Sequence, residues 1–175
     1  MIFKDIFLAP NLITITRLII SIILFINFEL TDFKPYILIV IISLIGISDA
    51  LDGFVARRFN LVSKLGTILD PFTDRLVFIL LIFWLSEIFP SWFFYGILMR
   101  EVIVFLGSIY VLTNTKTISV SKYGKFGTVL IFLSVCFFVL NFSYSSFIYQ
   151  IFGLLSLGFY YFVALEYLYR LLKDE

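Results

Sequence analysis

The chain has 175 residues, of which 62% are apolar and 14% are charged, and its formal net charge is +1. Soluble domains average about 45–50% apolar and about 25% charged residues, so a water-soluble globular domain is excluded. Most of the chain is instead expected to lie in a lipid bilayer. The near-neutral charge argues against a nucleic-acid partner.

Histidine is absent from the sequence, and a single cysteine, Cys136, lies in an apolar run. The absence of histidine excludes Ser-His-Asp triads, histidine nucleophiles and histidine-ligated metal sites. Cys136 cannot form an intrachain disulfide and is interpreted as a small buried apolar side chain. Carboxylates remain as the candidate ligands for a hard metal ion.

Six apolar stretches follow one another along the chain, each close to the ~20 residues that span ~30 Å of hydrocarbon. They are Leu12–Phe28, Pro35–Leu51, Pro71–Phe89, Trp92–Leu112, Phe126–Phe142 and Phe147–Tyr167. Pro35 and Pro71 are expected in the first turns of their helices. The pattern predicts an all-α polytopic membrane protein with six transmembrane helices, and the lack of a repeat or linker favours one domain over residues 1–175.

Over residues 2–7, apolar and charged residues alternate at roughly helical spacing. This pattern predicts a short interfacial helix on the membrane surface, not a cleaved signal peptide.

The distribution of lysine and arginine predicts the orientation of the six spans. If the N-terminus is cytoplasmic, nine basic residues lie in inner loops, inner helix ends or tails, and only Lys34 lies in an outer loop. Arg17, Arg75 and Arg100 lie within spans or at their ends. The bias predicts that the chain crosses the cell's inner membrane several times and that both termini face the cytoplasm.

Four aspartates stand where a membrane should exclude charge. Asp49 and Asp52 lie at the inner end of the second span, and Asp70 and Asp74 lie at the start of the third span. Spacings of three and four residues place each pair on one helical face. Because a cytoplasmic loop joins the two spans, all four carboxylates are expected to converge just inside the cytoplasmic boundary.

Four such anions in a low dielectric need positive charge close by. Arg57, Arg58 and Arg75 can supply part of it, and a divalent cation supplies more. Mg²⁺ and Mn²⁺ both prefer oxygen ligands of this kind. The alternative is a set of salt-bridged helix ends, which does not require aspartates at these spacings.

Residues 49–74 fit the pattern D-x2-D-G-x2-A-R-x8-G-x3-D-x3-D without a mismatch, and this pattern resembles the signature of the CDP-alcohol phosphotransferase family. The matching positions are Asp49, Asp52, Gly53, Ala56, Arg57, Gly66, Asp70 and Asp74. The six-span layout extends the resemblance over most of the chain.

The resemblance implies a transferase that joins a CDP-activated lipid, such as CDP-diacylglycerol, to an alcohol acceptor. Asp49, Asp52 and Asp70 are then expected to bind metal, as two Mg²⁺ or Mn²⁺ ions. Asp74 is expected to accept the proton of the acceptor hydroxyl while also contacting metal. A homodimer is implied as well.

The remaining motif residues have physical reasons to contact substrate. Gly53 lacks a Cβ, so a ligand can lie against the helix. Ala56 places another small side chain on the same face of the helix. Arg57 can bind a phosphate with two hydrogen bonds. Gly66 permits a tight loop or a close approach of helices.

Further candidates for substrate binding lie outside the motif. Arg100 is expected to hold a phosphate, or else to form a structural ion pair between helices, and Arg75 follows the last aspartate of the motif. Lys122 and Lys125 are either substrate ligands or ordinary positive-inside flanks. The first span begins with polar residues that resemble the N-x2-T-x2-R start of bacterial members, with capping and snorkelling as the alternative. These are Asn11, Thr14 and Arg17.

The sequence leaves more than one alcohol as the acceptor. The segment L-D-P-x-x-D-R and the Arg100-Glu101 pair resemble bacterial phosphatidylglycerophosphate synthases, which favours glycerol 3-phosphate. That group often has G-K-x-K-T at the start of the fifth span, whereas this chain has Gly127 in place of the second lysine. Because this second lysine is missing, two alternatives for the acceptor remain. One is phosphatidylglycerol, as in cardiolipin synthases of this fold, and the other is a different alcohol.

A small ion-coupled transporter is the alternative from another functional class, since transporters also carry intramembrane charges. The aspartates gather at one membrane face instead of the midplane, and no inverted repeat is visible. A scaffold without activity would not need four clustered aspartates. The sequence does not identify the preferred metal or acyl chains.

Overall fold

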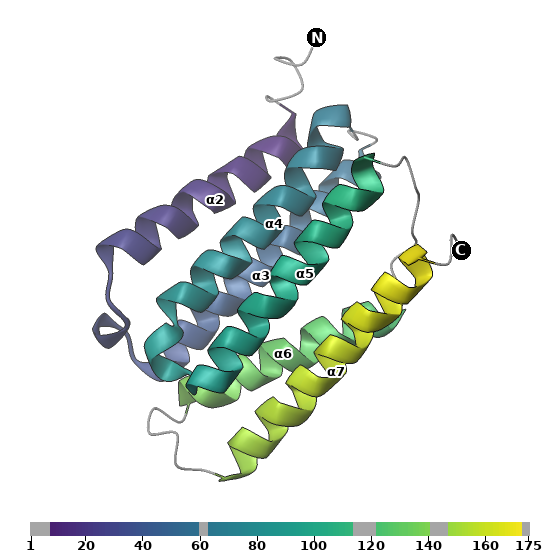
Figure 1. The fold of residues 1–175 in the computed structure, drawn as a ribbon. Helices are drawn as coiled ribbons and strands as arrows, with labels where there is room; N and C mark the ends of the chain where they lie inside the picture. Colours follow the sequence, from purple (N-terminus) through teal and green to yellow (C-terminus); the bar gives the residue numbers. More distant parts are fainter. Residues whose placement is uncertain (1–7, 60–62, 114–121, 141–146, 173–175) are drawn as a thin grey trace. The chain divides into compact units, whose positions relative to one another are not determined.

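The computed structural model describes residues 8–59, 63–113, 122–140 and 147–172. Six long helices account for most of them (Figure 1). They are α2 (Ala9–Asn27), α3 (Pro35–Arg58), α4 (Lys64–Trp84), α5 (Ser91–Thr113), α6 (Lys122–Leu140) and α7 (Phe147–Leu172). The all-α prediction is confirmed for the described residues, whereas the interfacial helix predicted over residues 2–7 lies outside them.

The helices extend beyond the apolar stretches into the charged motif. α3 continues to Arg58, and α4 begins at Lys64. The prediction that Pro71 occupies a first helical turn is wrong, because Ser63 caps α4 by accepting a hydrogen bond from the Gly66 backbone N–H at 2.9 Å. Helix-interior prolines are tolerated in membrane proteins, where other groups satisfy the freed backbone carbonyl. The motif aspartates therefore all lie on helices.

The chain divides into two compact units, residues 1–85 and 86–175. In the first unit, α2 packs against both α3 and α4. A short 3₁₀ helix, η1 (Leu30–Asp32), follows α2 and precedes Lys34, the N-cap residue of α3. Because α2 contacts both partners, its inward face can bring side chains of α3 and α4 together.

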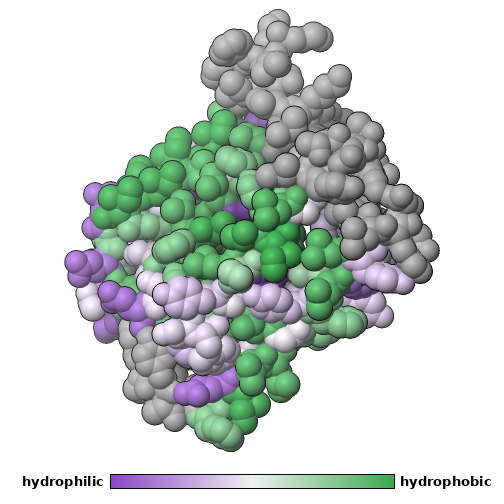
Figure 2. All heavy atoms as spheres, viewed as in Figure 1, coloured by the Kyte–Doolittle hydropathy of each residue, from purple (hydrophilic) through white to green (hydrophobic). Residues whose placement is uncertain are grey.

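Helix α2 is amphipathic in the sense opposite to that of a soluble protein. Its buried residues are Pro10, Asn11, Thr14, Arg17 and Ser21. Its exposed residues include Ile20, at 58% exposure, and Ile26, at 77%, and the surface above α2 is almost wholly apolar (Figure 2). A polar interior behind an apolar exterior is expected where lipid is the solvent.

In the second unit, α7 packs against both α5 and α6. A second 3₁₀ helix, η2 (Ser86–Ile88), precedes α5. Three aromatic rings, those of Phe89, Phe93 and Phe138, pack in the core, with the Phe93 and Phe138 centroids 4.8 Å apart. Gly153 of α7 lies against Phe138, where an added Cβ would be 2.9 Å from the ring.

Four helices are long and apolar enough to cross a membrane within the described part of the chain. The spans are Ala9–Asn27, Pro35–Ala56, Tyr123–Leu140 and Phe147–Tyr169. The other two long helices, α4 and α5, carry the charged residues Asp70, Asp74, Arg75, Arg100 and Glu101. The chain is therefore a polytopic helical membrane protein.

Candidate active site

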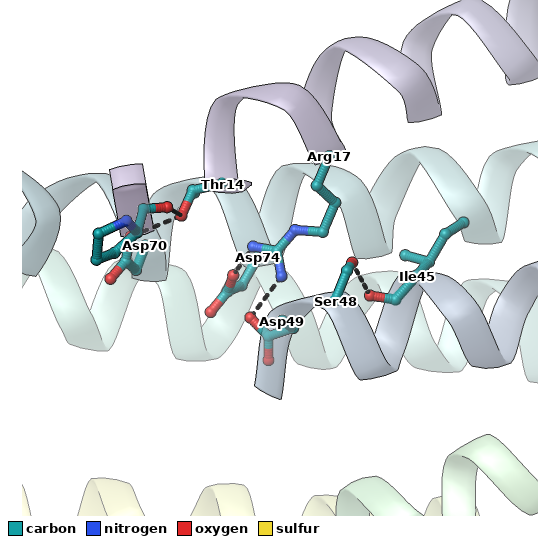
Figure 3. Close-up of polar contacts among 8 residues, drawn as sticks. Thr14, Arg17, Ile45, Ser48, Asp49, Asp70 and Asp74 are labelled. Carbon is teal, nitrogen blue, oxygen red and sulfur yellow. Dashed lines mark hydrogen bonds and ion pairs between the residues drawn. The ribbon is translucent and has the colours of Figure 1, made fainter. Parts of the chain in front are cut away.

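Arg17 joins two of the predicted aspartates from different helices. Its Nη1 donates a hydrogen bond to Asp49 Oδ1 of α3 at 2.7 Å, and its Nη2 donates to Asp74 Oδ1 of α4 at 2.5 Å (Figure 3). The Arg17 side chain is 4% exposed, whereas those of Asp49 and Asp74 are 48% and 39% exposed. A buried cation thus holds two carboxylates that remain open to a ligand.

The third described aspartate has a different partner. The Thr14 hydroxyl donates a hydrogen bond to Asp70 Oδ1 at 3.1 Å, and it also lies 3.1 Å from the Pro10 carbonyl oxygen. Thr14 is one helical turn before Arg17 on the buried face of α2. The same face of α2 therefore orients Asp70 and Asp74, which are one turn apart on α4.

Asn11 connects α2 to the beginning of α4. Its Nδ2 donates a hydrogen bond to Ser63 Oγ at 3.1 Å. A Cβ added to Gly66 would lie 2.6 Å from Asn11 Oδ1 and 3.2 Å from Ser63 Oγ. Gly66 therefore allows a close approach of helices, one of the two roles that the sequence suggested for it.

Part of the predicted positive charge comes from Arg17. Arg57, Arg58 and Arg75 were the candidates from the sequence to supply part of it, and among the described side chains Arg17 forms ion pairs with both Asp49 and Asp74. Arg58 is exposed at the end of α3. Ser63 was not predicted as part of the site, although a serine before a helical segment is a common N-cap signal.

Asp52 and Arg57 lie on α3 beside the site, but their side chains are outside the described ones, as is that of Lys122 on α6. Gly53 and Ala56 are partly exposed on α3, and Lys125 is exposed on α6. The structure thus brings Thr14 and Arg17 to the motif aspartates, and Asn11 to Ser63 and Gly66. The expected roles of the remaining residues stay predictions.

The acidic residues fit a divalent cation in their chemistry. Carboxylate oxygens are the ligands that Mg²⁺ and Mn²⁺ prefer, and those of Asp49 and Asp74 already surround one cation, the Arg17 guanidinium. Among the described side chains, no three acidic residues form a single metal-binding group. Asp49 and Asp74 converge on Arg17, whereas Asp70 binds Thr14.

The second unit holds a buried polar cluster of its own. Arg100 Nη1 donates to Glu101 Oε1 at 2.6 Å and to the Tyr160 hydroxyl at 3.0 Å, and that hydroxyl donates to Glu101 Oε1 at 2.7 Å. The Arg100 guanidinium carbon also lies 3.7 Å from the centre of the Tyr160 ring. Arg100 therefore forms an ion pair within α5, whereas the alternative to phosphate binding was an ion pair between helices. No sequence signal pointed to Tyr160.

The fold and site define a helical membrane protein with a cluster of carboxylates and a buried arginine among three helices. A family model described as CDP-alcohol phosphatidyltransferase matches residues 7–162, and the chain belongs to this family of enzymes. Family members use divalent metal ions, in agreement with the oxygen-rich site.

Three curated relatives show the range of acceptors in similar proteins. A CDP-diacylglycerol–glycerol-3-phosphate 3-phosphatidyltransferase of Aquifex aeolicus is 33% identical over 132 residues, covering 73% of this chain and 72% of the relative. A CMP-forming cardiolipin synthase of Streptomyces coelicolor is 43% identical over 65 residues, or 36% of this chain and 30% of the relative. A CDP-diacylglycerol–inositol 3-phosphatidyltransferase of Candida albicans is 37% identical over 90 residues, or 51% and 38%.

Proposed function

We propose that this protein transfers a phosphatidyl group from CDP-diacylglycerol to glycerol 3-phosphate, releasing CMP and forming phosphatidylglycerophosphate. The similarity to the Aquifex aeolicus transferase, which extends over 73% of the chain, carries this choice of acceptor. The arrangement of Asp49 and Asp74 around one cation supports a site that binds cations and, through them, anionic phosphates.

Asp49, Asp52, Asp70 and Asp74 would hold two divalent ions, Mg²⁺ or Mn²⁺. When bound, these ions neutralise the pyrophosphate and the departing phosphate. Gly53, Ala56, Arg57 and Gly66 would line the same face as substrate contacts, as the motif predicts. Arg75, Arg100, Lys122 and Lys125 are further candidates for contacts to the anionic substrates.

The transfer would be a single displacement. The oxygen of the acceptor hydroxyl attacks the lipid-side phosphorus of CDP-diacylglycerol, and the bond from that phosphorus to the CMP oxygen breaks. Asp74 accepts the hydroxyl proton, and Thr14 orients Asp70 one turn before it on α4. Inversion of configuration at phosphorus, read from a chirally labelled CDP-lipid, is the expected stereochemical outcome.

The membrane arrangement belongs to the same proposal. All six long helices, α2 to α7, would cross the inner membrane as a single domain over residues 1–175. Both termini and the carboxylate site would face the cytoplasm, in keeping with the nine basic residues on that side. The enzyme would act as a homodimer, as the family resemblance implies.

The proposal is tested by CMP release from CDP-diacylglycerol with the purified enzyme and a panel of alcohols. Asparagine at Asp49, Asp52, Asp70 or Asp74 is expected to abolish release, as is excess chelator. Asp32→Asn is the matched control, because Asp32 is an exposed acid in the same unit. Its side chain accepts a hydrogen bond from the Glu29 backbone N–H, outside the site. Near-normal release by any one of the four site variants would contradict the role of that residue.

Cardiolipin synthesis is the second candidate, and one observation favours it. Gly127, which stands where phosphatidylglycerophosphate synthases often have a lysine, is buried on α6 against α7, with Tyr160 Cδ2 3.4 Å from the position of an added Cβ. Gly127 itself supplies no cation to bind a dianionic acceptor. Release of CMP with phosphatidylglycerol but not with glycerol 3-phosphate would establish this alternative.

A further inference from the structure

We infer that Arg17 takes the place of a divalent cation between Asp49 and Asp74, and that the guanidinium and the metal compete for these two carboxylates. The inference rests on the proposed function, because it assumes that these aspartates hold metal. It assigns Arg17 a role in the metal-free protein that differs from simple substrate binding.

The Arg17 guanidinium has the geometry of a link between two helices. One planar group donates to a carboxylate of α3 through Nη1 and to a carboxylate of α4 through Nη2, at 2.7 and 2.5 Å. The two aspartates are 25 positions apart in sequence and lie on separate helices. Arg17 thus links the two helices through the same kind of oxygen that a bridging metal ion would use.

Arg17 and its two carboxylate partners differ in burial. The Arg17 side chain is 4% exposed, so its charge is removed from water and depends on the carboxylates for compensation. Asp49 and Asp74 are 48% and 39% exposed, so a cation can reach them from solvent. The protein therefore has a buried resident cation on these carboxylates, and a second cation can reach the same carboxylates from solvent.

The charges of Arg17 and a divalent ion oppose each other. A divalent ion bound to the same carboxylates would lie within a few ångströms of the guanidinium, and the two cations would repel each other strongly in a low dielectric. Each cation would also withdraw electron density from the shared oxygens and weaken their bonds to the other. Metal binding therefore loosens the Arg17 contacts, and a loosened guanidinium becomes available to an anionic group of the substrate.

The test is the effect of Mn²⁺ on thermal unfolding of the full-length protein in detergent. Without metal, Arg17→Met is expected to unfold several degrees below the wild type, because Asp49 and Asp74 lose their shared cation. With saturating Mn²⁺, most of this loss is expected to be recovered. The Mn²⁺-induced rise in unfolding temperature is therefore larger in Arg17→Met than in the wild type, and Mn²⁺ binds several-fold more tightly.

Arg58→Gln is the matched control, since it removes the same charge from an exposed position on α3. It should leave the Mn²⁺-induced rise unchanged. If Arg17→Met cannot be purified, Arg17→Lys carries the test, because an ammonium is a point charge that cannot span both carboxylates as a guanidinium does. Its Mn²⁺-induced rise should also exceed that of the wild type.

A rise in the Arg17 variants that equals or falls below the wild-type rise would overturn the inference and make Arg17 a permanent structural link. That result would leave the proposed function intact, because the wild type would still respond to Mn²⁺ and release CMP. If the wild type itself shows no response to Mn²⁺, or if Asp49→Asn keeps the full response, both the metal assignment and the competition are contradicted.

Discussion

Replacing Gly66 with alanine tests whether the approach of α2 to α4 positions the site. The new Cβ would lie 2.6 Å from Asn11 Oδ1, so the two atoms must separate by about 0.8 Å to reach the 3.4 Å of ordinary van der Waals contact. Asn11 is fully buried and bonded to Ser63, so it cannot move without losing that hydrogen bond or shifting the helix.

The expected cost combines overpacking, about 1–3 kcal/mol, with a weakened hydrogen bond, about 0.5–1.5 kcal/mol. Partial relaxation makes a net loss of about 2 kcal/mol reasonable. At about 2–4 °C per kcal/mol for a chain of this size, the unfolding temperature should fall by about 4–8 °C. CMP release should fall several-fold at temperatures where the variant is folded, because Thr14 and Arg17 move with Asn11.

The assay is thermal unfolding and CMP release of Gly66→Ala beside Gly46→Ala. Gly46 lies on α3, and an added Cβ there would have no neighbour within 4 Å. Alanine is favoured over glycine within a helix by about 0.5–1 kcal/mol, so this control should be as stable as the wild type or slightly more stable. The two substitutions are chemically identical and differ only in the space around them.

An Asn11→Ala background separates the steric explanation from others. With the amide removed, Gly66→Ala should cost much less than it does in the wild-type background, because Asn11 Oδ1 no longer obstructs the Cβ. Equal costs in the two backgrounds would refute the reasoning and assign the effect of Gly66 to the loop or to the substrate.

Three further predictions concern the second unit and the topology. Tyr160→Phe should lower stability by about 1–3 kcal/mol in thermal unfolding, because it leaves buried Glu101 without the donor at 2.7 Å; an unchanged unfolding temperature would contradict the structural role of the cluster. Gly153→Ala should destabilise by about 1–3 kcal/mol through contact with an aromatic ring at 2.9 Å, whereas Gly158→Ala, with open space around it, should not, and equal effects would count against the packing of α7. A cysteine at exposed Phe59, in a chain lacking the native cysteine, should react with an impermeant thiol reagent only in inside-out vesicles; labelling from outside intact cells would reverse the proposed orientation.

The polar face of α2 shows how much of the site the sequence could predict. Asn11, Thr14 and Arg17 recur every three residues, so they share a helical face, and a membrane helix turns such a face inward. The sequence therefore placed these residues with the motif. Their partners could not be predicted, because Arg17 lies 32 and 57 positions from Asp49 and Asp74, and several other arginines were equally available to neutralise them.

The choice among those arginines depends on depth, which sequence spacing does not specify. Arg58 ends α3 and remains in contact with solvent, where its charge is compensated by water. Arg17 lies two turns inside α2 and must find carboxylates to compensate its buried charge. The requirement of a buried guanidinium for anions therefore makes Arg17 a counter-ion of Asp49 and Asp74, and it ties the geometry of these carboxylates to the packing of α2.

The Arg100 cluster illustrates a second limit of sequence reasoning. Adjacent residues on a helix point about 100° apart and do not normally face each other, so neighbouring Arg100 and Glu101 gave no reason to expect a mutual ion pair. The pair forms on the surface of Tyr160, whose ring lies beneath the guanidinium and whose hydroxyl bonds both residues. Because Tyr160 is 59 residues from Glu101 and on another helix, only the packing of α7 against α5 reveals the pair. An arginine already bound to a carboxylate and a ring must break those contacts before it can bind a phosphate. The ion pair therefore reduces the case for Arg100 as a substrate ligand and strengthens it for Arg17, whose carboxylate partners a metal ion can take over.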